Sequence, residues 1–196
     1  MANQLPPTLH AHALENIQFI RSTMERAAAF SAVPGWGGVL MGMTAIGAAA
    51  VAHPLRLTER WLLLWLVEAA IAAAIGVWAI VAKSKRSGTP LAGPATRKFA
   101  LAFVPAIAAG AIVTWVLYRN GSVADLPGCW LLLYGTAVTS GGALSVGVVP
   151  LMGISFMALG AGAFAAPASW GDGFLAAGFG VLQIGFGIII ARRHGG

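Results

Sequence analysis

Charged residues are scarce in this chain. Asp, Glu, Lys and Arg make up 9% of its 196 residues, whereas about a quarter is usual in a soluble domain. In contrast, 58% of the residues are hydrophobic, and the mean hydropathy is +0.81. This imbalance excludes an ordinary water-soluble domain and indicates a protein that lies in a lipid bilayer.

Residues that carry chemistry are equally scarce. Cys129 is the only cysteine, which excludes an internal disulfide. No nucleophile–base motif, phosphate-binding loop or pair of carboxylates stands out, and the four histidines lie outside the apolar segments or at their ends. We therefore expect no catalytic activity, no bound metal and no cofactor.

Six apolar segments fill most of the chain, and each is long enough to cross a hydrocarbon core of roughly 30 Å as a helix. They are residues 37–53, 61–82, 99–118, 128–147, 150–167 and 173–191. Helices satisfy their own backbone hydrogen bonds in lipid, and the segments lack the alternation of a barrel strand. The sequence predicts an all-α, multi-pass membrane protein: a compact bundle of six transmembrane helices (residues 33–196) after an N-terminal arm (residues 1–32).

The basic residues predict the orientation of the bundle. The formal net charge of +6 does not indicate nucleic-acid binding, because the basic residues lie beside the apolar segments, where they set topology. One side holds nine Lys and Arg residues and the other holds three: Arg56, Arg60 and Arg119. The positive-inside rule therefore predicts a protein of the cell inner (plasma) membrane with both termini in the cytoplasm.

The N-terminal arm shows an amphipathic pattern. Leu14, Ile17, Ile20 and Met24 fall on one helical face, and charged residues lie towards the other. We expect residues 9–30 to form a helix along the inner membrane interface. Docking of this helix on a partner protein is the alternative.

Two patterns concern the packing of the expected bundle. Val-Pro recurs near the start of the first, third and fifth segments, at Pro34, Pro105 and Pro150, which suggests three tandem helical hairpins. Gly38 and Gly42 form a Gly-x-x-x-Gly pattern. Small residues allow close helix packing in lipid, so we expect this pair either to pack within the bundle or to form a face for a second copy.

Glu68 is the only ionisable residue well inside an expected span. Carboxyl groups within a membrane often mark proton or cation sites. Thr44, Thr139 and Gln183 reach similar depths, so they and Glu68 form a candidate intramembrane polar site. The alternative is that Glu68 forms a structural hydrogen bond to a neighbouring helix.

Two functions follow as hypotheses. The first is a non-catalytic accessory, scaffold or sensor subunit of a membrane assembly, with the lipid bilayer, other membrane subunits or a second copy as partners. The second is a small channel or transporter for protons, cations or small solutes that uses Glu68. A polar cavity around Glu68 would favour transport, and a closed bundle would favour the accessory role.

Overall fold

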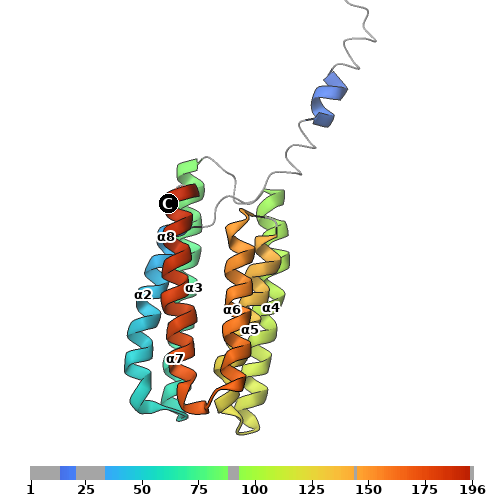
Figure 1. The fold of residues 1–196 in the computed structure, drawn as a ribbon. Coiled ribbons are helices and arrows are strands. Elements are labelled where there is room, and N and C mark those ends of the chain that lie inside the picture. Colours follow the sequence, from blue (N-terminus) through green and yellow to red (C-terminus); the bar gives the residue numbers. More distant parts are fainter. Residues whose placement is uncertain (1–13, 21–33, 88–92, 144, 195–196) are drawn as a thin grey trace, which may run out of the picture.

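The computed structural model describes residues 14–20, 34–87, 93–143 and 145–194, and within them the chain is helical without a strand. The long helices are α2 (Gly35–Ala52), α3 (Glu59–Ser87), α4 (Pro94–Arg119), α5 (Leu126–Gly142), α6 (Val148–Ala165) and α8 (Gln183–His194). The shorter elements are η1 (His53–Leu55), η2 (Val123–Asp125), η3 (Ala168–Trp170), α7 (Gly171–Leu175) and η4 (Ala176–Leu182), which is π-helical. The helices run up and down in a bundle (Figure 1).

Three short connections lie together at one end of the bundle (Figure 1). We call this end, formed by residues 53–58, 120–125 and 166–170, the hairpin end. Arg56 belongs to it, and Arg60 and Arg119 lie directly beside it, in the adjoining turns of α3 and α4. The more basic side of the sequence, including Arg86 and Arg97, lies at the opposite end, where α3 ends and α4 begins.

Five helices are long and apolar enough to cross a membrane. They are Gly35–Leu55, Glu59–Arg86, Pro94–Arg119, Val148–Ala165 and Ala168–Arg193. The last of them combines η3, α7, η4 and α8. These helices support the prediction of an all-helical membrane protein.

The α5 helix is shorter than the sequence predicted. The expected span was 128–147, but α5 ends at Gly142 and has 17 residues, about 25 Å at 1.5 Å per residue. Gly141 and Gly142 are poor helix formers, and a turn follows, in which the Ser145 amide donates to the Gly142 carbonyl at 2.9 Å. Because α5 is not among the five helices above, the count of six spans stays a prediction.

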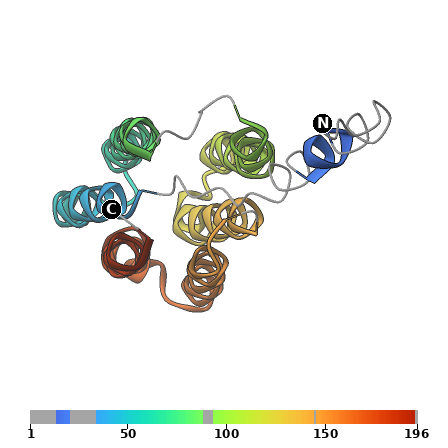
Figure 2. The same cartoon turned by 90° about the horizontal axis from the view of Figure 1, so that it is seen from above.

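The bundle consists of two groups of three helices (Figure 2). In one group α2 packs against both α8 and α3, and in the other α5 packs against both α6 and α4. The last two expected spans, α6 and the helix that ends in α8, do not pack closely as a hairpin. Instead α6 packs mainly against α5, and α8 packs mainly against α2. The structure therefore does not divide into three equivalent hairpins.

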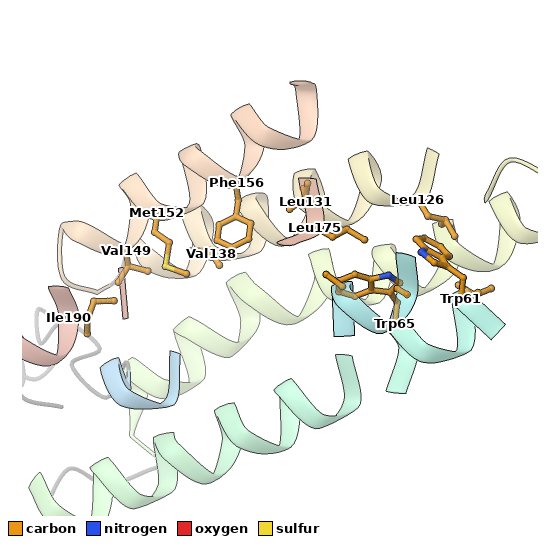
Figure 3. Close-up of a cluster of buried hydrophobic side chains, with 13 residues drawn as sticks. Trp61, Trp65, Leu126, Leu131, Val138, Val149, Met152, Phe156, Leu175 and Ile190 are labelled. Carbon is orange, nitrogen blue, oxygen red and sulfur yellow. The ribbon is translucent and has the colours of Figure 1, made fainter. Parts of the chain in front are cut away.

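A continuous apolar core joins the two groups (Figure 3). It extends from Trp61 and Leu126 near the hairpin end to Val149 and Ile190 near the opposite end. Aromatic rings fill its centre: Tyr134 of α5 lies 5.1 Å, centroid to centroid, from Phe179 of η4. Rings at such distances contribute to stability beyond their buried area.

The N-terminal arm is described only in part. Residues 14–20 are helical and their side chains are exposed, which agrees with the expected helix over this stretch. The rest of the predicted helix 9–30 lies outside the described residues, and its place at the membrane interface stays a prediction.

Candidate functional site

Glu68 and Thr44 are joined in the structure. Glu68 lies on α3 with 8% of its surface exposed, and its Oε1 is 2.8 Å from Thr44 Oγ1 on α2. Thr44 Oγ1 is also 2.8 Å from the Met41 carbonyl. The hydrogen bond ties the first two long helices together inside the bundle.

The Thr44 hydroxyl has one proton and two neighbouring acceptors. It makes one well-aligned hydrogen bond, to Met41 or to Glu68, or it shares its proton between the two acceptors. With a proton on the Glu68 carboxyl, Glu68 would donate to Thr44 and leave Thr44 to donate to Met41 alone. The pair is therefore compatible with a neutral carboxyl at Glu68.

The other two members of the predicted polar site lie elsewhere. Gln183 is buried on α8, where its Oε1 accepts a long hydrogen bond of 3.4 Å from the Tyr134 hydroxyl. Thr139 donates to the Gly135 carbonyl of its own helix at 2.8 Å and packs against Gly153 of α6. In the part of the chain that the structure describes, a hydrogen bond joins only Thr44 and Glu68 among these four residues. A functional role for the four stays a prediction.

Asp172 forms a second buried polar centre, near the hairpin end. It lies on α7 with 4% of its surface exposed. Two indole groups of α3 converge on its Oδ1: Trp61 Nε1 donates at 2.7 Å and Trp65 Nε1 at 3.3 Å. Asp172 therefore ties the last membrane-spanning helix to α3.

An arginine completes this centre. Arg56 Nε lies 3.6 Å from Asp172 Oδ2, within ion-pair distance. Both atoms are buried and neither has a hydrogen-bond partner, since 3.6 Å is too long for a proper hydrogen bond. The Arg56 guanidinium also contacts the ring of His53, with a shortest distance of 2.9 Å.

The turn before α3 holds these groups in place. Leu57 adopts a left-handed conformation with φ of 59°, which reverses the chain between Arg56 and α3. Thr58 then caps the helix, because its Oγ1 accepts from the Trp61 amide at 3.3 Å. Arg56 and Trp61 thereby face the same carboxylate.

Sequence reasoning missed the Asp172 centre, because it took Glu68 as the only ionisable residue well inside a span. The last span was expected to begin at residue 173, which left Asp172 in a connection. The last membrane-spanning helix begins at Ala168, so Asp172 lies inside it, just as Glu68 lies inside α3. Trp61 and Trp65 were a usable signal, because residues four apart share a helix face and each buried indole N–H needs an acceptor.

A π-helical segment separates Asp172 from Gln183. η4 spans Ala176–Leu182, and such segments are rare and often lie near functional sites. Here Gly180 packs against Ile46 of α2. The extra residue per turn changes which side of the last helix faces the bundle beyond this point.

Gly38 and Gly42 pack within the chain. A Cβ added to Gly42 would lie 2.8 Å from the Gly180 carbonyl oxygen, and one added to Gly38 would lie 3.4 Å from the Cα of Gly187. The pair therefore lets α2 approach the last helix closely, and a face for a second copy stays a prediction. No protein-family model matches this chain, and no curated protein and no solved structure does either.

Proposed function

We propose that this protein is a non-catalytic subunit of a membrane assembly, an accessory, scaffold or sensor component. In this proposal it crosses the inner membrane six times and has both termini in the cytoplasm. The lipid bilayer and other membrane proteins are its partners. The support comes from how the buried polar groups are used.

Both buried carboxyls form bonds between helices. Glu68 bonds to Thr44 of α2, and Asp172 bonds to Trp61 and Trp65 of α3. A buried polar group that bonds to a neighbouring element favours one arrangement of those elements, because moving them apart leaves it unsatisfied. Such bonds suit a rigid subunit that presents a fixed surface in the membrane.

Photo-crosslinking in native membranes tests this proposal. A crosslinking amino acid is placed at one strongly exposed apolar position on each of four elements: Leu63, Ile112, Leu151 and Val181. A subunit of an assembly should give a discrete protein adduct from one or two neighbouring positions and only lipid adducts from the others. Lipid adducts alone at every position would contradict the accessory role.

Transport is the second candidate, and the Glu68–Thr44 pair favours it. A carboxyl that shares a proton with a hydroxyl inside a membrane is chemically suited to bind and release protons. Transport also requires that water reach Glu68 from each side in turn. Flux measurements on the Glu68→Gln variant separate the two candidates.

A further inference from the structure

The geometry points to a phospholipid-binding site in the groove between α3 and α4. These two helices follow one another in the chain, yet they make little direct contact, and Figure 2 shows them in different helix groups. A groove of about 330 Å³ lies between them. Its walls are Leu62, Leu66, Ala111, Thr114, Trp115 and Tyr118.

The groove presents mainly hydrocarbon, because its two hydroxyl groups form hydrogen bonds elsewhere. The Thr114 hydroxyl donates to the Gly110 carbonyl at 2.7 Å and accepts from Trp130 Nε1 at 2.8 Å. The Tyr118 hydroxyl donates to Glu59 Oε1 at 2.9 Å. What remains towards the groove is apolar surface that suits a fatty acyl chain.

The Tyr118–Glu59 hydrogen bond also closes one end of the groove. It joins α4 to α3 at the hairpin end, so an occupant enters from the side. Leu66 and Trp115, one on each wall, are 45% and 58% exposed. In a membrane-spanning bundle this side faces the lipid.

A cation stands at the rim, where a lipid headgroup would lie. The Arg119 guanidinium lies 5.0 Å from the ring centroid of Trp115, a wall of the groove. Among the described residues no carboxylate lies within ion-pair distance of it. A planar guanidinium binds phosphate well, so Arg119 complements the phosphodiester of a phospholipid whose chain fills the groove.

The chemistry of the groove favours a lipid over a partner helix. Its walls are apolar, and the Arg119 guanidinium stands beside one of them, over the ring of Trp115. A phospholipid combines a hydrocarbon chain with a phosphate, so it matches both features.

The full-length protein in vesicles of phosphatidylethanolamine and phosphatidylglycerol provides the test. A tracer phospholipid in these vesicles carries a photoactivatable diazirine in its acyl chain, and mass spectrometry maps the adducts. We expect adducts to concentrate on the walls of the groove. An even distribution over all exposed helix faces would overturn the proposal, because it would show bulk lipid only.

Two neighbouring residues of α4 give a matched pair of variants. Ala111 lines the groove, and Ile112 is exposed beside it without lining it. Ala111→Trp should fill the groove and lower the adduct yield there several-fold, whereas Ile112→Trp should leave it unchanged. Circular dichroism confirms folding, and Ala111→Leu replaces the larger substitution if that one unfolds. Equal yields in a folded Ala111 variant and the Ile112 variant would refute the site.

Arg119→Gln tests the headgroup contact. It should lower the groove yield at least twofold, and Arg192→Gln, at the opposite end of the bundle, should not. Equal effects of the two changes would refute the role of Arg119. A crosslinker at Leu66 that captures a protein in native membranes would show that the groove holds a partner chain instead.

Discussion

Asp172 shows how much one side chain contributes to this bundle. It satisfies two buried indole donors and lies next to a partly buried arginine. Removing one partner of a buried charged group costs more than the pair contributes, because the remaining groups keep their desolvation penalty. The carboxyl is therefore a stabilising tie in the folded protein.

We predict that Asp172→Ala lowers the free energy of unfolding by about 3 kcal/mol, since it leaves both indoles and Arg56 without the carboxylate. Asp172→Asn keeps an acceptor for Trp61, and its cost should be about 1 kcal/mol. Unfolding in detergent micelles measures both values. An unchanged unfolding midpoint for the alanine variant would show that the centre is not structural.

The hydrogen bonds of Thr44 lead to a prediction about the protonation of Glu68. With Thr44 Oγ1 2.8 Å from both the Met41 carbonyl and Glu68 Oε1, a neutral Glu68 can donate to Thr44 while Thr44 donates to Met41. The infrared difference spectrum between the wild type and Glu68→Gln at neutral pH should show a protonated-carboxyl band that belongs to the wild type. A carboxylate band at this residue instead would mean that Thr44 donates to Glu68.

At the scale of helices, glycine contacts set the distance between α2 and the last helix. The chain contains a matched pair on α2: a Cβ at Gly42 would clash with Ile184 and the Gly180 carbonyl, whereas one at Gly47 would meet nothing within 4 Å. Backbone atoms cannot yield as a flexible side chain can.

We expect Gly42→Ala to destabilise the bundle by about 1–3 kcal/mol through overpacking. Gly47→Ala should be neutral or stabilising by up to about 1 kcal/mol, because alanine favours a helix. Thermal unfolding of the two variants in the same detergent compares them directly. A similar loss of thermal stability in both variants would argue against close packing at Gly42.

The helices were predictable from the sequence, but the contacts within the site were only partly so. Apolar length alone indicates a membrane helix, and five of the six expected spans coincide with helices that are long and apolar enough to cross a membrane. The early end of α5 depends on the turn after Gly142, and the π-helical segment depends on tertiary packing, so neither shows in hydropathy. The Thr44–Glu68 bond required the relative rotation of two helices, which a single sequence does not provide.

At the scale of the whole molecule, the structure collects basic residues mainly at one end of the bundle. The ends of α3 and α8 and the start of α4 carry Lys85, Arg86, Arg97, Lys98 and Arg192. The positive-inside rule predicts that this end lies in the cytoplasm. We propose that the hairpin end faces the outside.

Accessible cysteines check this orientation in a background in which Cys129 is replaced by serine. An impermeant thiol reagent applied to intact cells should label Asn120→Cys at the hairpin end. Lys85→Cys at the opposite end should react only after the membrane is permeabilised. The reverse pattern would invert the topology.

In the proposed subunit, the buried carboxyls of Glu68 and Asp172 hold the helices together and do not carry a transported species. Wild type and Glu68→Gln, reconstituted in sealed vesicles, are compared for proton and cation flux and for thermal stability. We expect no flux above empty vesicles for either protein and nearly equal stability, because the amide can still donate to Thr44. Flux in the wild type that is lost in a stable Glu68→Gln variant would refute the structural role and establish transport.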